Sequence, residues 1–272
     1  MAILREQWAL VLNTSANTDT YTSSESFTVG GGADHVLVLA VQFTDQTGAL
    51  NFANTTVFAG ATQMTLAAGL SFANGQQPGA GIYYLVDPAA GSTTFTANVK
   101  DGSNAAATVR GCSMTAFELS GIDPTDVLED ADAVTVGSGT DARIELTTAN
   151  AGCFVIVGGA IYGGGHTPWT PVGCTELLDG QTGTTNFNDH GYFVGQLEVA
   201  TASTFTVGAD PTTEDSKAFA AAAFNPGASG PEPISGTASG AISLSGSATT
   251  QAAIAAGAAG ALALGGSGDL VG

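Results

Sequence analysis

The chain has 272 residues, of which 24 are acidic and 5 are basic, so its formal net charge at pH 7 is −19. Five scattered cations cannot neutralise a run of phosphates, which excludes nucleic-acid binding, and the same deficit argues against docking on an anionic membrane. With 44% apolar residues the chain is not a disordered acidic tail either, and its length suffices for one large β domain or two small ones.

The N-terminal stretch 1–8 has no basic region followed by a long apolar run, so the sequence predicts no signal peptide. The most apolar stretch, Ala252–Leu264, is interrupted by Gly257 and Gly260 and is shorter than the roughly twenty residues that a spanning helix needs. We therefore expect synthesis in a cytoplasm and no membrane segment.

Three cysteines, Cys112, Cys153 and Cys174, form an odd and widely spaced set. A disulfide scaffold or a zinc site would need pairs or close spacing. Cys112 and Cys153 lie within apolar runs, where a free thiol behaves as a small hydrophobic group. We expect buried, reduced cysteines.

Residues 1–226 are typical of a chain of short β-strands separated by turns. Runs rich in Val, Ile, Phe, Tyr and Thr alternate with clusters of Gly, Asn, Asp and Pro, and no long helical period occurs. Such spacing predicts an all-β fold, and we expect a two-sheet antiparallel β-sandwich of jelly-roll type. The expected strands are Trp8–Leu12, His35–Phe43, Ala80–Val86, Thr93–Val99, Ser113–Leu119, Ala142–Thr148, Cys153–Ile161, Gly191–Val199, Thr204–Val207 and Ala218–Phe224.

Two of these runs also predict their own surroundings. Residues 36–41 are apolar at every position, which indicates a strand covered on both faces. In the run 142–148, Ile144 and Leu146 alternate with polar residues, which indicates a strand with one face in water.

The composition changes after Pro226. Residues 227–233 have the composition of a linker, and residues 234–272 repeat with a period of twenty. A flexible low-complexity tail is one interpretation. The other, which we favour, is an ordered segment for oligomerisation or docking, because branched aliphatic residues stay in register between the copies. These candidate assembly residues are Ile234, Ile242, Leu244, Ile254, Leu262 and Leu264.

Motifs that would fix a reaction are missing from the sequence, including the zinc-protease, nucleophile-elbow, phosphate-loop and dinucleotide-binding patterns. His166, Asp189 and His190 could converge as a base or a metal site, but each also suits a strand end or a loop. We therefore expect no catalytic residue and no cofactor.

Acidic residues gather between positions 121 and 132. Hard cations such as calcium take six to eight oxygen ligands, so a calcium site is one interpretation, although the spacing does not fit an EF-hand. A solvated acidic loop is the interpretation we prefer. The calcium candidates are Asp123, Asp126, Glu129, Asp130 and Asp132.

Three aromatic residues lie near a glycine-rich segment, 163–165, and could stack against a sugar ring. These glycan candidates are Tyr162, Trp169 and Tyr192.

Three stretches carry a family resemblance: Val57–Thr65, Gly81–Phe95 and Phe117–Asp123. In this order they resemble a β-sandwich module found in bacteriophage virion and tail structural proteins and in large bacterial surface proteins. The Gly/Ala/Ser repeat resembles the tails that end some phage structural proteins. The resemblance implies fold positions, turn glycines and core aromatics, and it carries over no active-site residue.

From these observations we expect a non-enzymatic virion structural protein, made in the host cytoplasm and acting as capsid decoration, head fibre or tail-fibre component. Its expected partners are other copies of itself, most simply in a homotrimer, and other capsid or tail proteins. The alternative is a carbohydrate-binding receptor or adhesin module that contacts a host-surface glycan.

Overall fold

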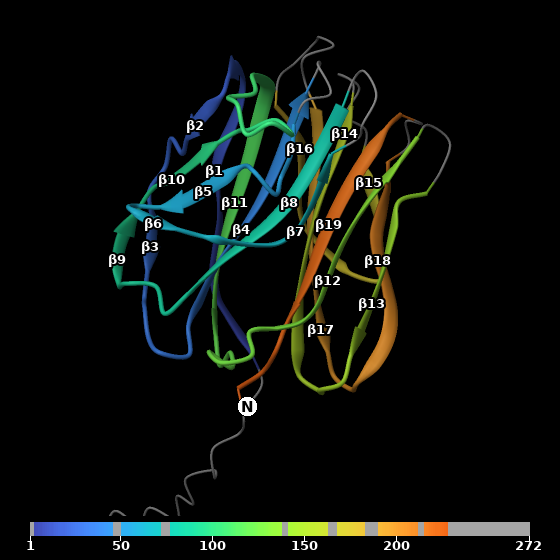
Figure 1. Cartoon of the computed structure of the whole chain (residues 1–272). Helices are drawn as coiled ribbons and strands as arrows, with labels where there is room; N and C mark the ends of the chain where they lie inside the picture. The colour runs from blue at the N-terminus through green and yellow to red at the C-terminus, as the bar shows by residue number, and fades with distance from the viewer. Residues whose placement is uncertain are drawn as a thin grey trace, which may run out of the picture. The chain divides into compact units, whose positions relative to one another are not determined.

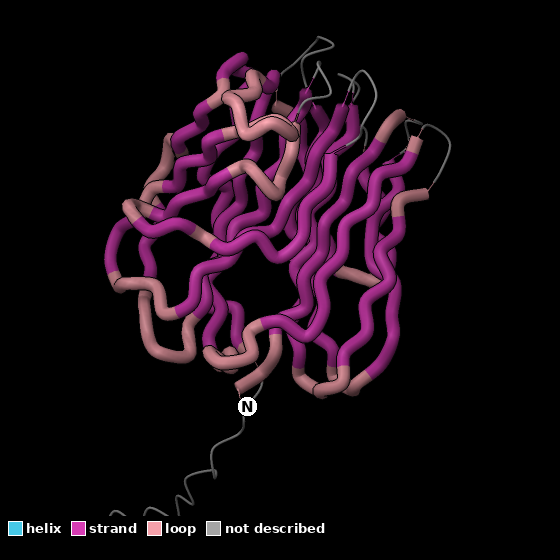
Figure 2. The backbone as a smooth tube through the Cα atoms, in the orientation of Figure 1, coloured by secondary structure: helices cyan, strands magenta, loops and turns pink. Residues whose placement is uncertain are grey.

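The computed structural model describes residues 3–45, 50–71, 77–137, 141–162, 168–182, 190–211 and 215–227, and these form strands joined by loops (Figures 1 and 2). Every strand pairing in this part of the chain is antiparallel, which confirms the expected all-β class. Among the described residues, no helix is long and apolar enough to cross a membrane. The chain divides into the compact unit Met1–Ala228 and a second unit, Ser229–Gly272, so the candidate assembly residues lie outside the described part.

The first half of the compact unit contains eleven strands. Five form the first inner sheet, in the order β1-β11-β4-β8-β7, and four form the first outer sheet, β2-β10-β5-β6; β3 and β9 pair separately. Their bounds are β1 Leu4–Thr18, β2 Thr20–Thr22, β3 Phe27–Val29, β4 Val36–Asp45, β5 Thr56–Ala59, β6 Thr62–Gln63, β7 Thr65–Ser71, β8 Gln77–Val86, β9 Gly91–Thr93, β10 Phe95–Asn98 and β11 Val109–Ser120.

The second half contains eight strands. Five form the second inner sheet, β12-β19-β14-β17-β16, and three form the second outer sheet, β13-β18-β15. Their bounds are β12 Leu128–Val136, β13 Arg143–Thr148, β14 Cys153–Tyr162, β15 Trp169–Val172, β16 Thr175–Gln181, β17 His190–Val199, β18 Ser203–Pro211 and β19 Lys217–Phe224.

The two halves have the same topology. When the short strands β3, β6 and β9 are set aside, each half has eight strands, and both inner sheets follow the order first-eighth-third-sixth-fifth. The outer sheets likewise share the order second-seventh-fourth. Local features repeat as well: a glycine with positive φ follows the fourth strand of each half, Gly60 (58°) and Gly173 (64°). The chain is therefore a tandem of two equivalent halves.

Three hydrophobic cores lie between successive layers, which Figure 1 shows side by side. The first core joins the first outer and first inner sheets through residues such as Phe95 and Leu39. The middle core joins the two inner sheets, where Phe117 and Phe224 are fully buried. The third core joins the second inner and second outer sheets around Trp169.

The sequence pattern explains which strands occupy the inner layers. All six residues of the segment 36–41 are buried, because β4 contacts the first core on one face and the middle core on the other. In β13, Ile144 and Leu146 are buried while Glu145 is exposed, as one-sided covering requires. Both expected environments are confirmed.

Close approach of the inner sheets depends on small residues. A Cβ atom on Gly158 of β14 would lie 2.8 Å from Gln42 Nε2 of β4, so a larger residue there would displace the buried Gln42 amide. In β19, Ala218, Ala220 and Ala222 face the same interface. Glycine and alanine here set the separation between the two halves.

Each of the ten expected strands overlaps a strand of the structure, but two other expectations need correction. A single two-sheet sandwich is too simple, because the described residues of the unit form five sheets and three cores. The acidic segment is not a loop throughout, since β12 begins at Leu128 and includes Glu129, Asp130 and Asp132. This strand pairs with β19, and its own residues Ala131 and Ala133 pack on the middle core.

Both ends of the described chain lie at one end of the compact unit. Leu4 pairs with Ser120, and the Gly227 amide donates to the Gly121 carbonyl at 2.8 Å. Ile122 and Pro226 form an isolated bridge beside them. The segment that follows β19 therefore starts next to the junction between the two halves.

Because all three cores are complete by Phe224, we predict that the compact unit folds without residues 231–272. A chain ending at Gly230 should unfold cooperatively on heating, with the far-ultraviolet circular dichroism of a β protein and a melting temperature within a few degrees of the full chain. An aggregated or non-cooperative product would show that the C-terminal segment contributes to the core.

Candidate functional site

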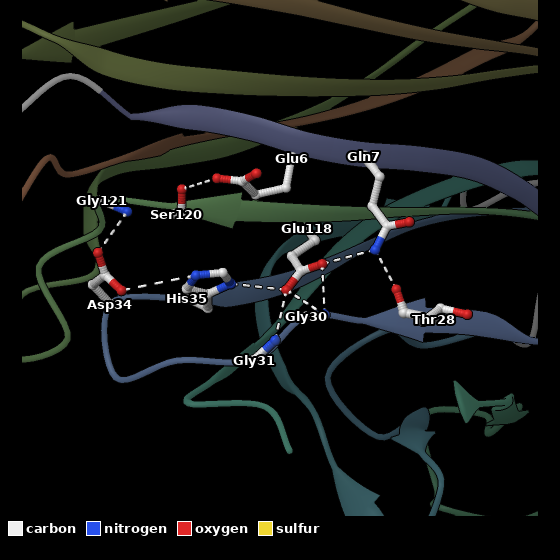
Figure 3. Close-up of polar contacts among 10 residues, drawn as sticks. All are labelled: Glu6, Gln7, Thr28, Gly30, Gly31, Asp34, His35, Glu118, Ser120 and Gly121. Carbon is white, nitrogen blue, oxygen red and sulfur yellow. Dashed lines mark hydrogen bonds and ion pairs between the residues drawn. The ribbon is translucent and has the colours of Figure 1, made fainter. Parts of the chain in front are cut away.

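A buried carboxylate organises one end of the first half. The side chain of Glu118, on β11, is 1% exposed and points at the loop that joins β3 to β4 (Figure 3). The Gly30 amide donates to both carboxylate oxygens, at 2.9 and 3.0 Å, and the Gly31 amide donates to Oε1 at 2.9 Å. His35 Nδ1 lies 2.8 Å from Oε1, and Gln7 Nε2 donates to Oε2 at 2.8 Å.

These donors determine the charge state of the carboxyl group. Burial by itself raises the pKa of Glu118, but the hydrogen bonds from the Gly30 amide, Gln7, His35 and the Gly31 amide outweigh burial and hold the pKa below its usual range. The group is therefore an anion whose oxygens are occupied by donors from three segments of the chain. We call Glu118, Gln7, His35 and the Gly30–Gly31 backbone the Glu118 clamp.

The imidazole of His35 is fixed by the same clamp. With Nδ1 bound to Glu118, its Nε2 atom lies 3.9 Å from Asp34 Oδ1, and the His35 side chain is 18% exposed. The other Asp34 oxygen accepts the Gly121 amide at 3.3 Å. An oriented histidine is a component of acid–base sites, but both ring nitrogens of this one face carboxylates of the protein itself, Glu118 and Asp34. The arrangement ties the 30–35 loop to β1, β11 and the junction between the halves.

A second polar network lies between the inner sheets at the opposite end of the strands. His190, on β17, is fully buried; its Nε2 lies 3.3 Å from Ser113 Oγ and its Nδ1 3.4 Å from Thr182 Oγ1. Ser113 in turn donates to Gln42 Oε1 at 2.8 Å. Burial lowers the pKa of His190 to about 3, so the imidazole is neutral at pH 7 and joins the two halves as a hydrogen-bonding group.

Three atoms beside this network have no hydrogen-bond partner among the described residues: Gln42 Nε2, Thr44 Oγ1 and Thr115 Oγ1. Since buried polar groups are normally satisfied, they mark the places where ordered water would bind. Neither polar network is evident from the sequence, because the pairings of Glu118 with His35 and of Ser113 with His190 link residues far apart in the chain.

The calcium candidates are spread over a turn and a strand, and their oxygens accept hydrogen bonds from the protein. Asp123 Oδ1 accepts from the Thr125 amide and hydroxyl, and Asp130 Oδ2 accepts from the Thr147 amide at 2.7 Å. Asp126 accepts from Asn225, Glu129 from Asn150, and Asp132 from the Ala133 amide. Within the described ranges, no three His, Cys, Asp or Glu residues are grouped so that they could hold a metal ion.

The three glycan candidates are core residues in this structure. Trp169 is 4% exposed and packs edge-on against Phe219, with ring centroids 5.7 Å apart; Tyr162 and Tyr192 are also buried. None of the three presents a ring face to solvent, so they do not form a stacking platform. In the sequence, the adjacent glycine segment makes these residues candidates for a sugar-binding site. The structure shows instead that Trp169 fills the third core.

The remaining candidate residues are the three cysteines, His166 and Asp189. Cys112 and Cys153 are buried free thiols, as expected, whereas Cys174 is partly exposed. His166 and Asp189 lie outside the described residues, so their expected convergence with His190 cannot be placed.

Comparison with known proteins gives no relative. No protein-family model, no curated protein and no solved structure matches the chain.

Replacing Glu118 by glutamine should destabilise the protein. The new amide would set its own NH2 donor against the Gly30 and Gly31 amides, so we expect a loss of about 3 kcal/mol, or ~6–12 °C in melting temperature. The matched control is Glu145→Gln, the same change at an exposed strand position. Equal melting temperatures for the two variants would show that the clamp does not hold the loop.

The free energy of unfolding should decrease at acidic pH because His190 is held neutral in the folded protein. The folded protein holds this group neutral down to about pH 3, whereas an unfolded histidine protonates near pH 6.5. The unfolded state therefore binds the extra proton, and the unfolding free energy should drop by about 1.4 kcal/mol per pH unit below 6.5, or ~2 kcal/mol at pH 5. Urea unfolding of the wild type and of His190→Gln at pH 5 and 7 measures the effect. The same drop in both proteins would assign the pH dependence to other groups.

Proposed function

We propose that the protein is a non-enzymatic structural component of a bacteriophage virion, used as capsid decoration, head fibre or tail-fibre component. The observation that carries the proposal is the tandem of two β halves sharing a middle core, followed directly by a Gly/Ala/Ser segment with aliphatic residues in a twenty-residue register. A compact unit followed in the sequence by a repeat segment suits a part that is attached to a larger particle.

The strand order of each half also supports this role. An eight-stranded jelly roll places its first, eighth, third and sixth strands in one sheet and its second, seventh, fourth and fifth in the other. Each half of this chain follows that order, except that the fifth strand, β7 or β16, pairs with the sixth. In the first half, β6 still pairs with β5 before the chain crosses to the inner sheet as β7. Jelly rolls recur in viral capsid proteins, which is an argument from fold alone.

The residues behind the family resemblance have structural roles here. Gly60 makes the turn between β5 and β6, Tyr83 is buried in the first core, and Phe117 is buried in the middle core. Gly121 has a φ of 77° and lies at the junction between the halves. Buried positions and turns of this kind support a role for these residues in folding.

The polar clusters favour the same conclusion. The Glu118 clamp and the His190 network each use ionisable groups to connect distant strands. A carbohydrate-binding module remains the second candidate only through surfaces other than Tyr162, Trp169 and Tyr192.

We predict that self-association and incorporation into particles depend on the C-terminal repeat. Replacing Ile242, Leu244, Leu262 and Leu264 by serine removes side chains whose full burial contributes about 1.5–3 kcal/mol each. Light scattering should then give the mass of a single chain, where the wild type gives a closed oligomer such as a trimer or joins a larger particle. Circular dichroism should be unchanged.

The chain ending at Gly230 is the second arm of this experiment and should behave like the serine variant. Equal masses and equal incorporation for all three proteins would reduce the repeat to a spacer and remove the main support for a virion role.

A further inference from the structure

The outer strands of the first half carry no charged side chains, and charged residues close to them in the sequence, such as Asp19, Lys100 and Asp101, lie beyond the strand ends. The strands β2, β5, β6 and β10 of the first outer sheet, together with β3 and β9, contain no Asp, Glu, Lys, Arg or His. Alternate residues such as Tyr21, Val57 and Phe95 enter the first core, so the others face outward. The outward residues, which we call the neutral face, are Thr20, Thr22, Thr28, Thr56, Phe58, Thr62, Gln63, Thr96 and Asn98.

Hydroxyl and amide groups on this face pair across the strands. Thr22 Oγ1 lies 3.3 Å from Thr96 Oγ1, and Thr20 Oγ1 lies 3.4 Å from Asn98 Oδ1 and 3.2 Å from Asp19 Oδ1 at the edge of the face. Phe58 is half-buried beside them. The result is a surface of short side chains with one aromatic ring, which needs little rearrangement to pack against another surface.

The equivalent sheet of the second half has a different outer surface. Its strands include Arg143, Glu145 and Asp210, and Arg143 pairs with Asp210 at 2.6 Å. It keeps the same threonine pair, however: Thr147 and Thr204 are register partners, with their hydroxyls 2.9 Å apart, as Thr22 and Thr96 are in the first half. Two surfaces of the same topology thus differ in charge, while a matched pair of residues is retained on both.

The net charge of the chain bears on which surface two copies can use to contact each other. Copies with a formal charge of −19 repel one another, and like charges placed opposite each other in a contact are costly. Contact through strands that carry no ionisable side chains reduces that cost. We infer that the neutral face is the surface by which the folded unit contacts a second copy of the chain. The inference rests on the proposed function, since it names the surface that self-assembly uses alongside the C-terminal repeat.

A neutral saccharide is the competing occupant, because hydroxyl and amide groups also bind sugars. We favour a second copy since several of these groups already pair with one another across the strands and Phe58 offers only part of one ring. Binding of sugar is therefore an outcome of the test.

The experiment introduces like charges on the neutral face of the full-length chain. We expect Thr22→Glu with Thr96→Glu to raise the concentration of half-maximal association, measured by light scattering, by at least about tenfold. The matched control, Thr147→Glu with Thr204→Glu, makes the same change at the equivalent pair of the second half and should leave association unchanged. Circular dichroism and the melting temperature verify folding.

A second experiment, by charge complementation, distinguishes charge repulsion from a structural defect of the Glu variant. Thr22→Lys with Thr96→Lys should impair association alone, and an equimolar mixture of the Lys and Glu variants should restore it. Equal association of the face variant and its control would overturn the inference, as would a mixture that fails to recover.

Two further outcomes separate this inference from the proposed function. If the serine variant of the repeat loses association while the face variant keeps it, assembly proceeds through the repeat alone and the neutral face is not a contact. Glycan-array binding by the wild type that disappears in the face variant, but not in its control, would assign the surface to a carbohydrate and overturn the inference.

Discussion

The middle core between the two inner sheets is the interaction on which the rest of the structure depends. Each inner sheet has a second core on its other face, so the packing of Phe117 and Ile82 against Phe154 and Phe224 turns two β halves into one unit. It works because β14 and β19 present glycine and alanine where the sheets approach most closely. Apolar area buried between layers supplies the stabilisation, and small side chains set the distance at which it is obtained.

The tandem arrangement places two halves of the same topology face to face within one chain. Strands β8 and β19 are in contact across the middle core, and so are their counterparts β17 and β11; β4 meets its own counterpart, β14, between them. Equivalent pairs of this kind occur in an isologous interface, but β7 contacts β12 and β19 more extensively than β16 contacts β1 and β11, so the two-fold relation is incomplete. Covalent linkage of the halves removes the concentration dependence of that contact, and it leaves the two outer sheets free to differ. One outer surface is neutral and the other charged, which is the basis for assigning them different roles.

Polar side chains fix the two ends of this layered unit. At one end Glu118 holds the 30–35 loop with an anion that is surrounded by donors, and at the other His190 joins Ser113 to Thr182 as a neutral ring. Both groups depart from their solution pKa in the direction that their surroundings impose: donors stabilise the anion, and dry burial disfavours the cation. They connect distant strands and make the stability of the unit sensitive to acid.

The sequence by itself determined the class of fold, the positions of ten strands and the one-sided or two-sided covering of β13 and β4, because these follow from local alternation of apolar residues. It also contained traces of the duplication, in Gly60 and Gly173 and in the Thr-Phe-Thr segments 94–96 and 204–206, which were visible but too short to recognise alone. Only the tertiary structure decided that Trp169 is a core residue, that an acidic segment forms β12, and that Glu118 meets His35. Those facts depend on which distant strands pair and stack, and no local pattern in the chain specifies that choice.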